Sequence, residues 1–244
     1  MHRILVSSKQ ISKDKIIMLK GEQAHYIDDV LRLKSNEPVV AFDEAGNEYA
    51  CSVEKSTGRI TLRVKEKRTL LKNSKRMFLT VACAIPKKSR LDDIIDKLTQ
   101  LGVDRIIPLK TKRVIIKLDS RKEDLRHGRW KRIAVSAAQQ SQRNTLPIIE
   151  PIRNIREVLS SSGDFDLKLI PTLTGKRKTL KEVFIASKPK DVLVLIGPEG
   201  DFTDEEVALA KKSGFIPVSL GDLVLRVETA AVCVASFIRL YENG

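Results

Sequence analysis

Two turns that contain glycine follow apolar segments near the C-terminus and offer a place for a small molecule. Gly197-Pro198-Glu199-Gly200 follows the apolar run 192–196, and Ser219-Leu220-Gly221 ends the apolar segment 215–220. Glycine lets the main chain approach a ligand closely, and ligands of open α/β sheets bind at the carboxyl ends of the strands. We therefore interpret residues 193–240 as a cofactor site, with both turns at one edge of a parallel sheet.

A charged pair, Arg226 and Glu228, follows these turns at the start of an apolar helical segment. A glutamate in the first turn of a helix is favourable beside the positive end of the helix dipole, so the pair could serve only to cap that helix. The two side chains could equally belong to the site, and their spacing alone does not separate these interpretations.

Several other kinds of chemistry lack their usual residues. The chain has no G-x-x-x-x-G-K-[ST] phosphate loop, no G-x-G-x-x-G dinucleotide motif and no G-x-S-x-G nucleophile elbow. Its histidines are His2, His25 and His127, and no cysteine or histidine pair has zinc-ligand spacing. We therefore expect neither a nucleophilic triad nor a metal.

The cysteines and the hydropathy of the chain indicate its cellular location. Cys51, Cys83 and Cys233 are few and far apart, which indicates reduced thiols in a cytoplasmic protein. No apolar run approaches the roughly 18 residues that a bilayer span needs, so no membrane association is expected.

Basic residues are concentrated in the middle of the chain, whose formal net charge is +14. Residues 73–153 carry 19 basic and 8 acidic residues, whereas 1–72 carry 14 and 10, and 154–244 carry 12 and 13. Such clustering favours contact with a polyanion, and the alternative is a set of solvated lysine-rich faces. The arginines of this segment favour phosphate contact, because a guanidinium pairs with two oxygens at once.

The first 70 residues are expected to form a small β-barrel. Short strand-like segments alternate with turn formers, at 16–19, 38–42, 49–53 and 60–64. Apolar residues at helical spacing predict a helix at 22–33. The charged stretch 65–75 suggests a boundary near residue 72, which divides the chain into 1–72 and 73–244.

From residue 77, apolar runs alternate with helical patterns, which indicates an α/β domain with a mainly parallel sheet. Strands are expected at 77–84, 103–109, 114–116, 166–170, 192–196 and 215–220. The run 192–196 is apolar throughout and should lie at the sheet centre. Helices should begin at Ser89, at Arg121 with Leu125 and Trp130 inward, after the capping box of Thr203 and Glu206, and near Glu228.

Taken in order, these motifs resemble the ribosomal RNA small subunit methyltransferase E family. The resemblance covers nearly the whole chain. It is carried by Gly197–Gly200, Gly214–Gly221 and Leu225–Ala230, and by His2-Arg3, Val30–Leu33, Leu101–Val103, Ile107–Leu109 and Ala137–Asn144 with Pro147. It implies a PUA-like RNA-binding β-barrel at 1–72 and a SPOUT-class α/β methyltransferase domain with a trefoil knot at 73–244.

The resemblance also implies an activity and partners. The enzyme would transfer a methyl group from S-adenosylmethionine to N3 of one uridine in 16S rRNA of the small (30S) ribosomal subunit, and it would be a homodimer through the C-terminal domain. The cofactor would contact Leu195, Ile196, Gly197, Pro198, Glu199, Gly200, Ser219, Leu220, Gly221, Leu225, Arg226, Glu228, Thr229 and Ala230. RNA would contact Arg3, Arg32, Arg113, Arg143 and Asn144.

Uridine N3 carries a proton on the Watson–Crick edge, so the base must be unpaired and must lose that proton. Arg143 and Arg226 are candidates to stabilise the developing anion, and Asn144 could read the base edge. Glu228 is the candidate base. A plain phosphate contact is the alternative for Arg143, and a structural ion pair is the alternative for Arg226 with Glu228.

The chain departs from the family pattern at several positions. Asp201 stands where the family often has a second glycine, Val227 where it often has threonine, and Gln100, Lys112 and Gln139 where it usually has acidic residues. Two rival functions follow: an RNA-binding or ribosome-assembly factor without catalysis, and a SPOUT methyltransferase that acts at another RNA site.

Overall fold

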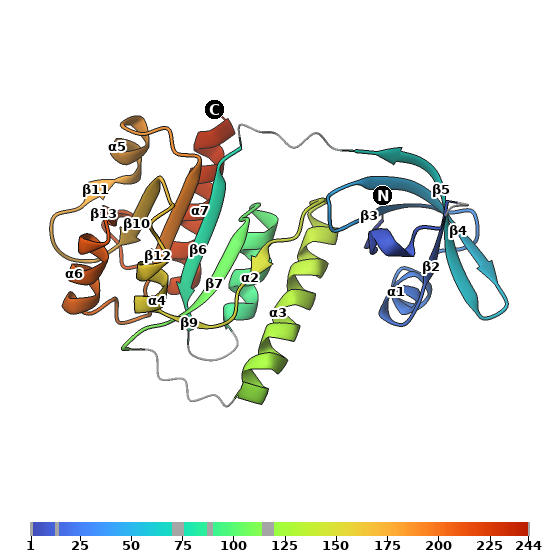
Figure 1. Cartoon of the computed structure of the whole chain (residues 1–244), viewed down its shortest axis with the longest axis horizontal. Helices are drawn as coiled ribbons and strands as arrows, with labels where there is room; N and C mark the ends of the chain where they lie inside the picture. Colours follow the sequence, from blue (N-terminus) through green and yellow to red (C-terminus); the bar gives the residue numbers. More distant parts are fainter. Residues whose placement is uncertain (1, 13–14, 70–75, 87–89, 114–119, 244) are drawn as a thin grey trace. The chain divides into compact units, whose positions relative to one another are not determined.

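The computed structural model in Figure 1 describes residues 2–12, 15–69, 76–86, 90–113 and 120–243. They form two compact units. The N-terminal unit comprises Met1–Asn73 and Val135–Leu146, and the C-terminal unit comprises Ser74–Ala134 and Pro147–Gly244. The expected boundary at residue 72, the expected strand 114–116 and the expected helix start at Ser89 lie outside the described residues.

The N-terminal unit is built on a curled five-stranded sheet (Figure 1). The order is β1 (Arg3–Leu5), β3 (Pro38–Phe42), β4 (Glu48–Ser56), β5 (Arg59–Arg68) and β2 (Ile16–Leu19). β1 pairs with β3 in parallel, and the other pairs are antiparallel. The buried core includes Ile4, Ile17, Ile27, Val39, Val53 and Leu62. A short 3-10 helix, η1 (Ser8–Gln10), follows β1.

The helix expected at 22–33 is shorter than predicted. It comprises α1 (Glu22–His25) and a π-helical turn, η2 (Tyr26–Val30). Leu31 caps it, and Arg32 has a left-handed φ of 53° that no helix can continue through. The apolar spacing alone did not reveal this change of backbone direction.

Val135–Leu146 belong to the N-terminal unit, and Arg3 bonds to a residue of this segment. Arg3 is 8% exposed, and its guanidinium donates hydrogen bonds to the side chains of Glu48 and Asn144. It also lies 5.3 Å from the centre of the Phe42 ring. The Arg3–Asn144 contact joins residues 141 positions apart, so it leaves no local signal in the sequence.

The C-terminal unit contains an eight-stranded sheet whose strand pairs are all parallel, as predicted. Its order is β11 (Lys178–Thr179), β13 (Ile216–Ser219), β10 (Leu167–Pro171), β12 (Asp191–Ile196), β6 (Phe78–Ala84), β7 (Arg105–Lys110) and β8 (Ile148–Ile149), with β9 (Arg153–Asn154) beside β7. β12 lies at the centre and its apolar side chains are buried, which confirms the expectation for this run.

Helices cover both faces of this sheet (Figure 1). Leu79, Val81 and Cys83 of β6 face α2 (Arg90–Gln100), α3 (Ser120–Gln140), α5 (Leu180–Ile185) and α7 (Val227–Asn243), in one core cluster. Ala82 belongs to a second cluster, with α4 (Ile155–Ser160) and α6 (Asp204–Lys212). This alternation is what a strand covered on both faces requires.

The expectation that Leu125 faces inward was wrong. Leu125 is 67% exposed, whereas Trp130 is 3% exposed and lies in the core. The buried side chains of α3 begin at Trp130. The apolar spacing therefore predicted a buried face that starts about one turn too early. None of the helices within the described ranges is long and apolar enough to cross a membrane.

Candidate active site

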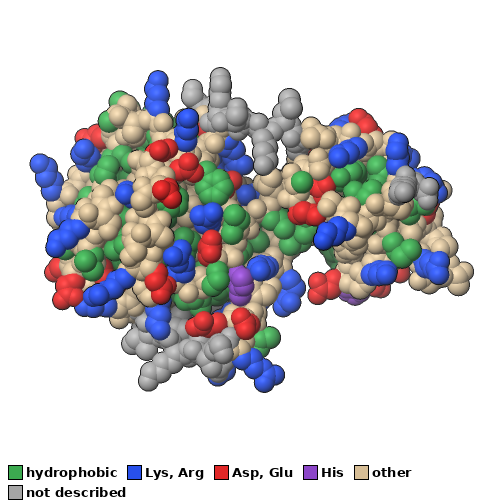
Figure 2. Space-filling model, viewed as in Figure 1, with side chains coloured by type: hydrophobic (Ala, Val, Ile, Leu, Met, Phe, Trp, Pro, Cys, Tyr) green, Lys and Arg blue, Asp and Glu red, His purple; other side chains and the backbone are tan. Residues whose placement is uncertain are grey.

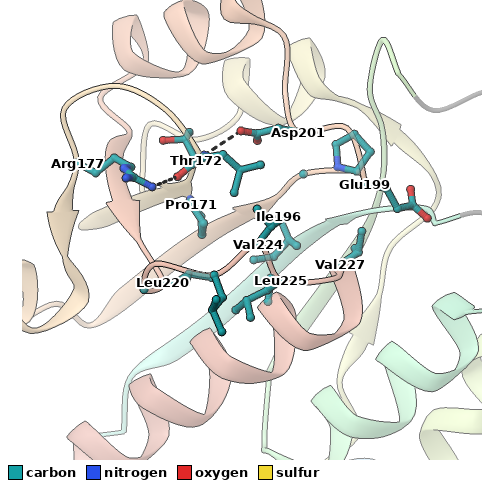
Figure 3. Close-up of a pocket in the computed structure, with 16 residues that line it drawn as sticks. Pro171, Thr172, Arg177, Ile196, Glu199, Asp201, Leu220, Val224, Leu225 and Val227 are labelled. Carbon is teal, nitrogen blue, oxygen red and sulfur yellow. Dashed lines mark hydrogen bonds between the residues drawn. The ribbon is translucent and has the colours of Figure 1, made fainter.

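One pocket lies at the carboxyl edge of the parallel sheet, where segments that follow β10, β12 and β13 meet the start of α7 (Figure 3). It has a volume of about 570 Å³, including the part open to solvent. It is lined by Pro171, Thr172, Leu173, Arg177, Ile196, Gly197, Pro198, Glu199, Asp201, Leu220, Gly221, Leu223, Val224, Leu225, Val227 and Ala230.

The structure brings many of the expected cofactor residues together in this pocket. Those that line it are Ile196, Gly197, Pro198, Glu199, Leu220, Gly221, Leu225 and Ala230. Leu195, Gly200, Ser219, Arg226, Glu228 and Thr229 lie beside these residues in the chain without lining the pocket. The two glycine turns therefore do share one sheet edge.

Sequence reasoning missed two parts of the lining. They are the third loop, Pro171–Leu173, and Arg177, which directly precedes β11 in the chain. Arg177 donates from Nη1 to the carbonyl oxygen of Thr172, 3.0 Å away. A strand at 166–170 was expected, so the rule for strand ends pointed to this loop. What was lacking was the strand order, which puts β10 directly beside β12.

The capping box predicted for α6 is present and has a second role. Glu206 Oε2 accepts from the amide of Thr203 at 2.9 Å, and Thr203 Oγ1 accepts from the amide of Glu206 at 3.2 Å. Glu206 is 2% exposed, and its Oε1 accepts from the amide of Lys112 at 2.8 Å. The same side chain therefore starts α6 and fixes the main chain just before Arg113.

Arg113, an expected RNA contact, lies against the pocket loop. Its Nη1 donates to the carbonyl oxygen of Gly200, and the carbonyl oxygen of Asp201 is 3.4 Å away. The side chain remains exposed. A guanidinium that holds two consecutive carbonyl groups restrains the segment that follows β12.

Arg226 and Glu228 have different surroundings. Arg226 is exposed at the start of α7, where its carbonyl oxygen accepts from the amide of Ala230 at 2.8 Å. Glu228 is half-buried.

Two carboxylates lie close to the end of β6. Burial, and then the charges of Glu228 and Glu199, raise the pKa of the Cys83 thiol well above its ordinary value. Glu199 lines the pocket, and Figure 3 shows it on the opposite side from Arg177. The pocket thus combines an apolar lining with the Arg177 guanidinium on one side and the Glu199 carboxylate on the other.

The remaining expected RNA contacts belong to the N-terminal unit. Arg32 is exposed, and Arg143 is partly exposed with its Nε 3.3 Å from Thr145 Oγ1. Arg3 is buried by its bonds to Glu48 and Asn144, so its guanidinium is engaged within the protein. On the face in Figure 2, lysine and arginine side chains are spread over the surface with acidic side chains between them.

Comparisons with known proteins agree with this arrangement. The sequence model of the RNA methyltransferase domain matches residues 73–239, and that of the RNA methyltransferase PUA domain matches residues 19–67. Ribosomal RNA small subunit methyltransferase E of Rickettsia conorii is 30% identical over 240 residues, which span 98% of this chain and 95% of the relative. The chain belongs to the ribosomal RNA small subunit methyltransferase E family. The predicted combination of a PUA-like barrel with a SPOUT-class α/β domain is thereby confirmed.

Two solved structures resemble the whole chain. A putative methyltransferase from Legionella pneumophila, in complex with the bound cofactor SAM, is 30% identical with a TM-score of 0.89, over 98% of this chain and 97% of that one. The family member from Neisseria gonorrhoeae, bound to S-adenosyl methionine, is 27% identical with a TM-score of 0.88, over 99% and 98%.

Three departures from the family pattern have local partners here. Gln100 donates to Asp96 Oδ2 at 2.8 Å, and Lys112 pairs with Glu205. Val227 is 3% exposed and lies between the core and the pocket. At these positions the side chains serve packing and surface contacts that do not require the family's usual residues.

Proposed function

We propose that this protein methylates N3 of a specific uridine in 16S rRNA of the small ribosomal subunit, with S-adenosylmethionine as the methyl donor. The observation that carries the proposal is the pocket itself. The family's two glycine turns and the start of α7 converge there at the carboxyl edge of the sheet. Relatives of similar sequence and fold have been solved with this cofactor.

The lining of the pocket fits this cofactor in its chemistry. Ile196, Leu220 and Leu225 offer apolar surface for a purine ring. Arg177 matches the carboxylate of the methionine part, and Glu199 matches its ammonium and sulfonium charges. When bound, S-adenosylmethionine supplies an electrophilic methyl group.

The protein's own residues would then prepare the uridine. Arg143 and Arg226 would stabilise the anion that forms as N3 loses its proton. Glu228, half-buried at the start of α7, would accept that proton. Because Arg3 donates to Asn144 Oδ1, the Asn144 amide nitrogen is the group that can donate to a uracil carbonyl.

We further propose that residues 1–72 and the basic segment 73–153 bind the RNA. Arg32 and Arg143 would contact it from the N-terminal unit, and Arg113 from the C-terminal unit, while Arg3 would act by holding Asn144 in place. Residues 73–244 would carry the family's trefoil knot around the cofactor. The reaction would take place in the cytoplasm, where small subunits are assembled.

A homodimer through the C-terminal unit is part of this proposal. The outward stripe of α7 carries Thr229, Cys233 and Leu240, which are exposed, and Phe237, which is partly exposed. An apolar stripe of this kind on a terminal helix suits a subunit interface. Sedimentation of the natural chain should give a dimer, and Leu240→Glu should shift it toward the monomer.

The activity can be tested with purified components. The protein, methyl-tritiated S-adenosylmethionine and small subunits from a strain without this gene would be incubated together, and the labelled RNA digested to nucleosides. We expect label in N3-methyluridine of 16S rRNA, with large subunits as the unlabelled control. Label in another nucleoside would indicate another RNA site, and absence of label would favour the assembly factor.

A further inference from the structure

Asp201 has a main-chain conformation that few side chains adopt. Its φ is +60°, in the left-handed region. This region is unfavourable for most residues that have a Cβ atom, but aspartate and asparagine tolerate it because their short polar side chains bond to nearby main chain. The turn is closed by the Asp201 amide, which donates to the carbonyl oxygen of Pro198 at 2.9 Å.

The Asp201 carboxylate joins two loops that line the pocket. Its Oδ1 accepts from the amide of Phe202 at 2.8 Å, and its Oδ2 accepts from the amide of Leu173 at 2.9 Å. Figure 3 draws the second bond, which crosses from the loop after β12 to the loop after β10. Leu173 lines the pocket and is 44% exposed.

The Asp201 peptide is also held from its other side. Arg113 donates to the carbonyl oxygen of Gly200 and approaches that of Asp201, while Glu206 fixes the main chain of Lys112. Phe202, the next residue, is 4% exposed and packs in the core. Because the main chain on both sides of Asp201 is held in place, its carboxylate can hold the Leu173 amide at a fixed position.

We propose that Asp201 is a positioning residue for the cofactor, because its carboxylate ties the loop after β10 to the loop after β12 and sets the width of the pocket between them. This inference rests on the proposed function, in which the pocket takes S-adenosylmethionine. A ligand that enters a pre-ordered pocket does not have to order two loops on binding, so its affinity is higher.

Two substitutions of Asp201 separate the effect of the carboxylate from that of the main-chain conformation. Asp201→Asn keeps the shape of the side chain and tolerates the left-handed φ, but its amide nitrogen cannot accept from a main-chain N–H. Asp201→Gly removes the bridge between the loops and adopts the left-handed φ without strain. Asp222→Asn is the matched control, since Asp222 is exposed between the pocket residues Gly221 and Leu223 and its substitution removes the same charge.

Calorimetric titration of S-adenosylmethionine into each purified full-length protein tests the inference. We expect Asp201→Asn and Asp201→Gly to raise the Kd about tenfold, the ratio expected for one lost hydrogen bond to a charged group. Asp222→Asn should stay within about twofold of the natural chain. In the methylation assay, the KM for S-adenosylmethionine should rise while kcat at saturation changes little, and the Leu173 amide should exchange its hydrogen faster in both Asp201 variants.

The outcomes distinguish this inference from the proposed function. If the natural chain binds S-adenosylmethionine and both Asp201 variants bind it equally well, the positioning role is wrong while the proposed function stands. An equal loss in Asp222→Asn would also overturn it, because the effect would then be one of charge alone. If the natural chain does not bind the cofactor, the proposed function fails and this inference fails with it.

Discussion

Alanine substitution should destabilise the fold at Gly197 and have little effect at Gly200, although the two glycines belong to one motif. A Cβ atom on Gly197 would lie 3.1 Å from Cδ2 and from Cε2 of Phe202, and 3.4 Å from Asp201 Oδ1. Phe202 is 4% exposed in a packed core, so it has little room to move. A Cβ atom on Gly200 would meet Arg113 Cδ at 3.3 Å, and this side chain is exposed, so it can shift by the few tenths of an ångström that the contact needs.

The magnitudes follow from these contacts. Overpacking a core costs about 1–3 kcal/mol, so Gly197→Ala should lower the free energy of unfolding by about 2 kcal/mol. For a domain of this size, that corresponds to a fall in Tm of roughly 4–8 °C. Gly200→Ala should stay within about 0.5 kcal/mol of the natural chain, as surface substitutions usually do.

Thermal unfolding of the two purified variants without cofactor measures this difference directly. Calorimetry should add a loss of S-adenosylmethionine affinity of about tenfold for Gly197→Ala, because the displaced loop lines the pocket. Equal Tm changes in the two variants would refute the reasoning, since the motif would then respond to any side chain at either glycine. A larger loss for Gly200→Ala would refute it more strongly.

Three other substitutions test separate parts of the account. Arg143→Ala should lower methyl transfer about 100-fold while the Kd for S-adenosylmethionine is unchanged, and normal turnover would exclude the catalytic role. Arg239→Met removes a buried guanidinium that donates to the carbonyl oxygens of Met77 and Gly102 as well as to Asp104. Asp104 keeps Arg76 3.3 Å away, so urea unfolding should give a loss of about 1–3 kcal/mol, and a loss below about 0.5 kcal/mol would contradict it. Burial raises the pKa of Asp43, but hydrogen bonds that include one from Tyr49 outweigh it and hold this pKa below 3.8. The stability that the ionised group contributes is therefore present near neutral pH and lost as the pH falls below about 4. Asp43→Asn should remove most of this acid dependence, measured by unfolding between pH 3 and 7.

Elements with a strong local signal were predictable from the sequence. The apolar run 192–196 indicated a central strand, and the spacing of Thr203 and Glu206 indicated the start of α6. Both signals arise from residues a few positions apart, so no knowledge of the rest of the fold was needed. The two glycine turns could also be placed at one sheet edge by the general rule for parallel strands.

Features that depend on long-range packing were not predictable. The loop Pro171–Leu173 completes the pocket only because β10 lies between β13 and β12. Arg113 carries a charge that suggests RNA, but the Gly200 carbonyl that it contacts is 87 residues away. Arg3 and Asn144 are likewise joined across 141 residues. In each case the residue type was informative, and its partner was set by the tertiary structure.

The central claim is that this pocket supports methylation of a uridine in 16S rRNA, and primer extension tests it most directly. A methyl group on N3 blocks the Watson–Crick edge, so reverse transcriptase stops at the modified base. We predict a stop in 16S rRNA of the natural strain that disappears when the gene is deleted. The natural chain should restore it, and a chain with Leu220→Arg, which places a charged side chain in the pocket, should not. An unchanged stop in the deletion strain, or its restoration by Leu220→Arg, would contradict the account.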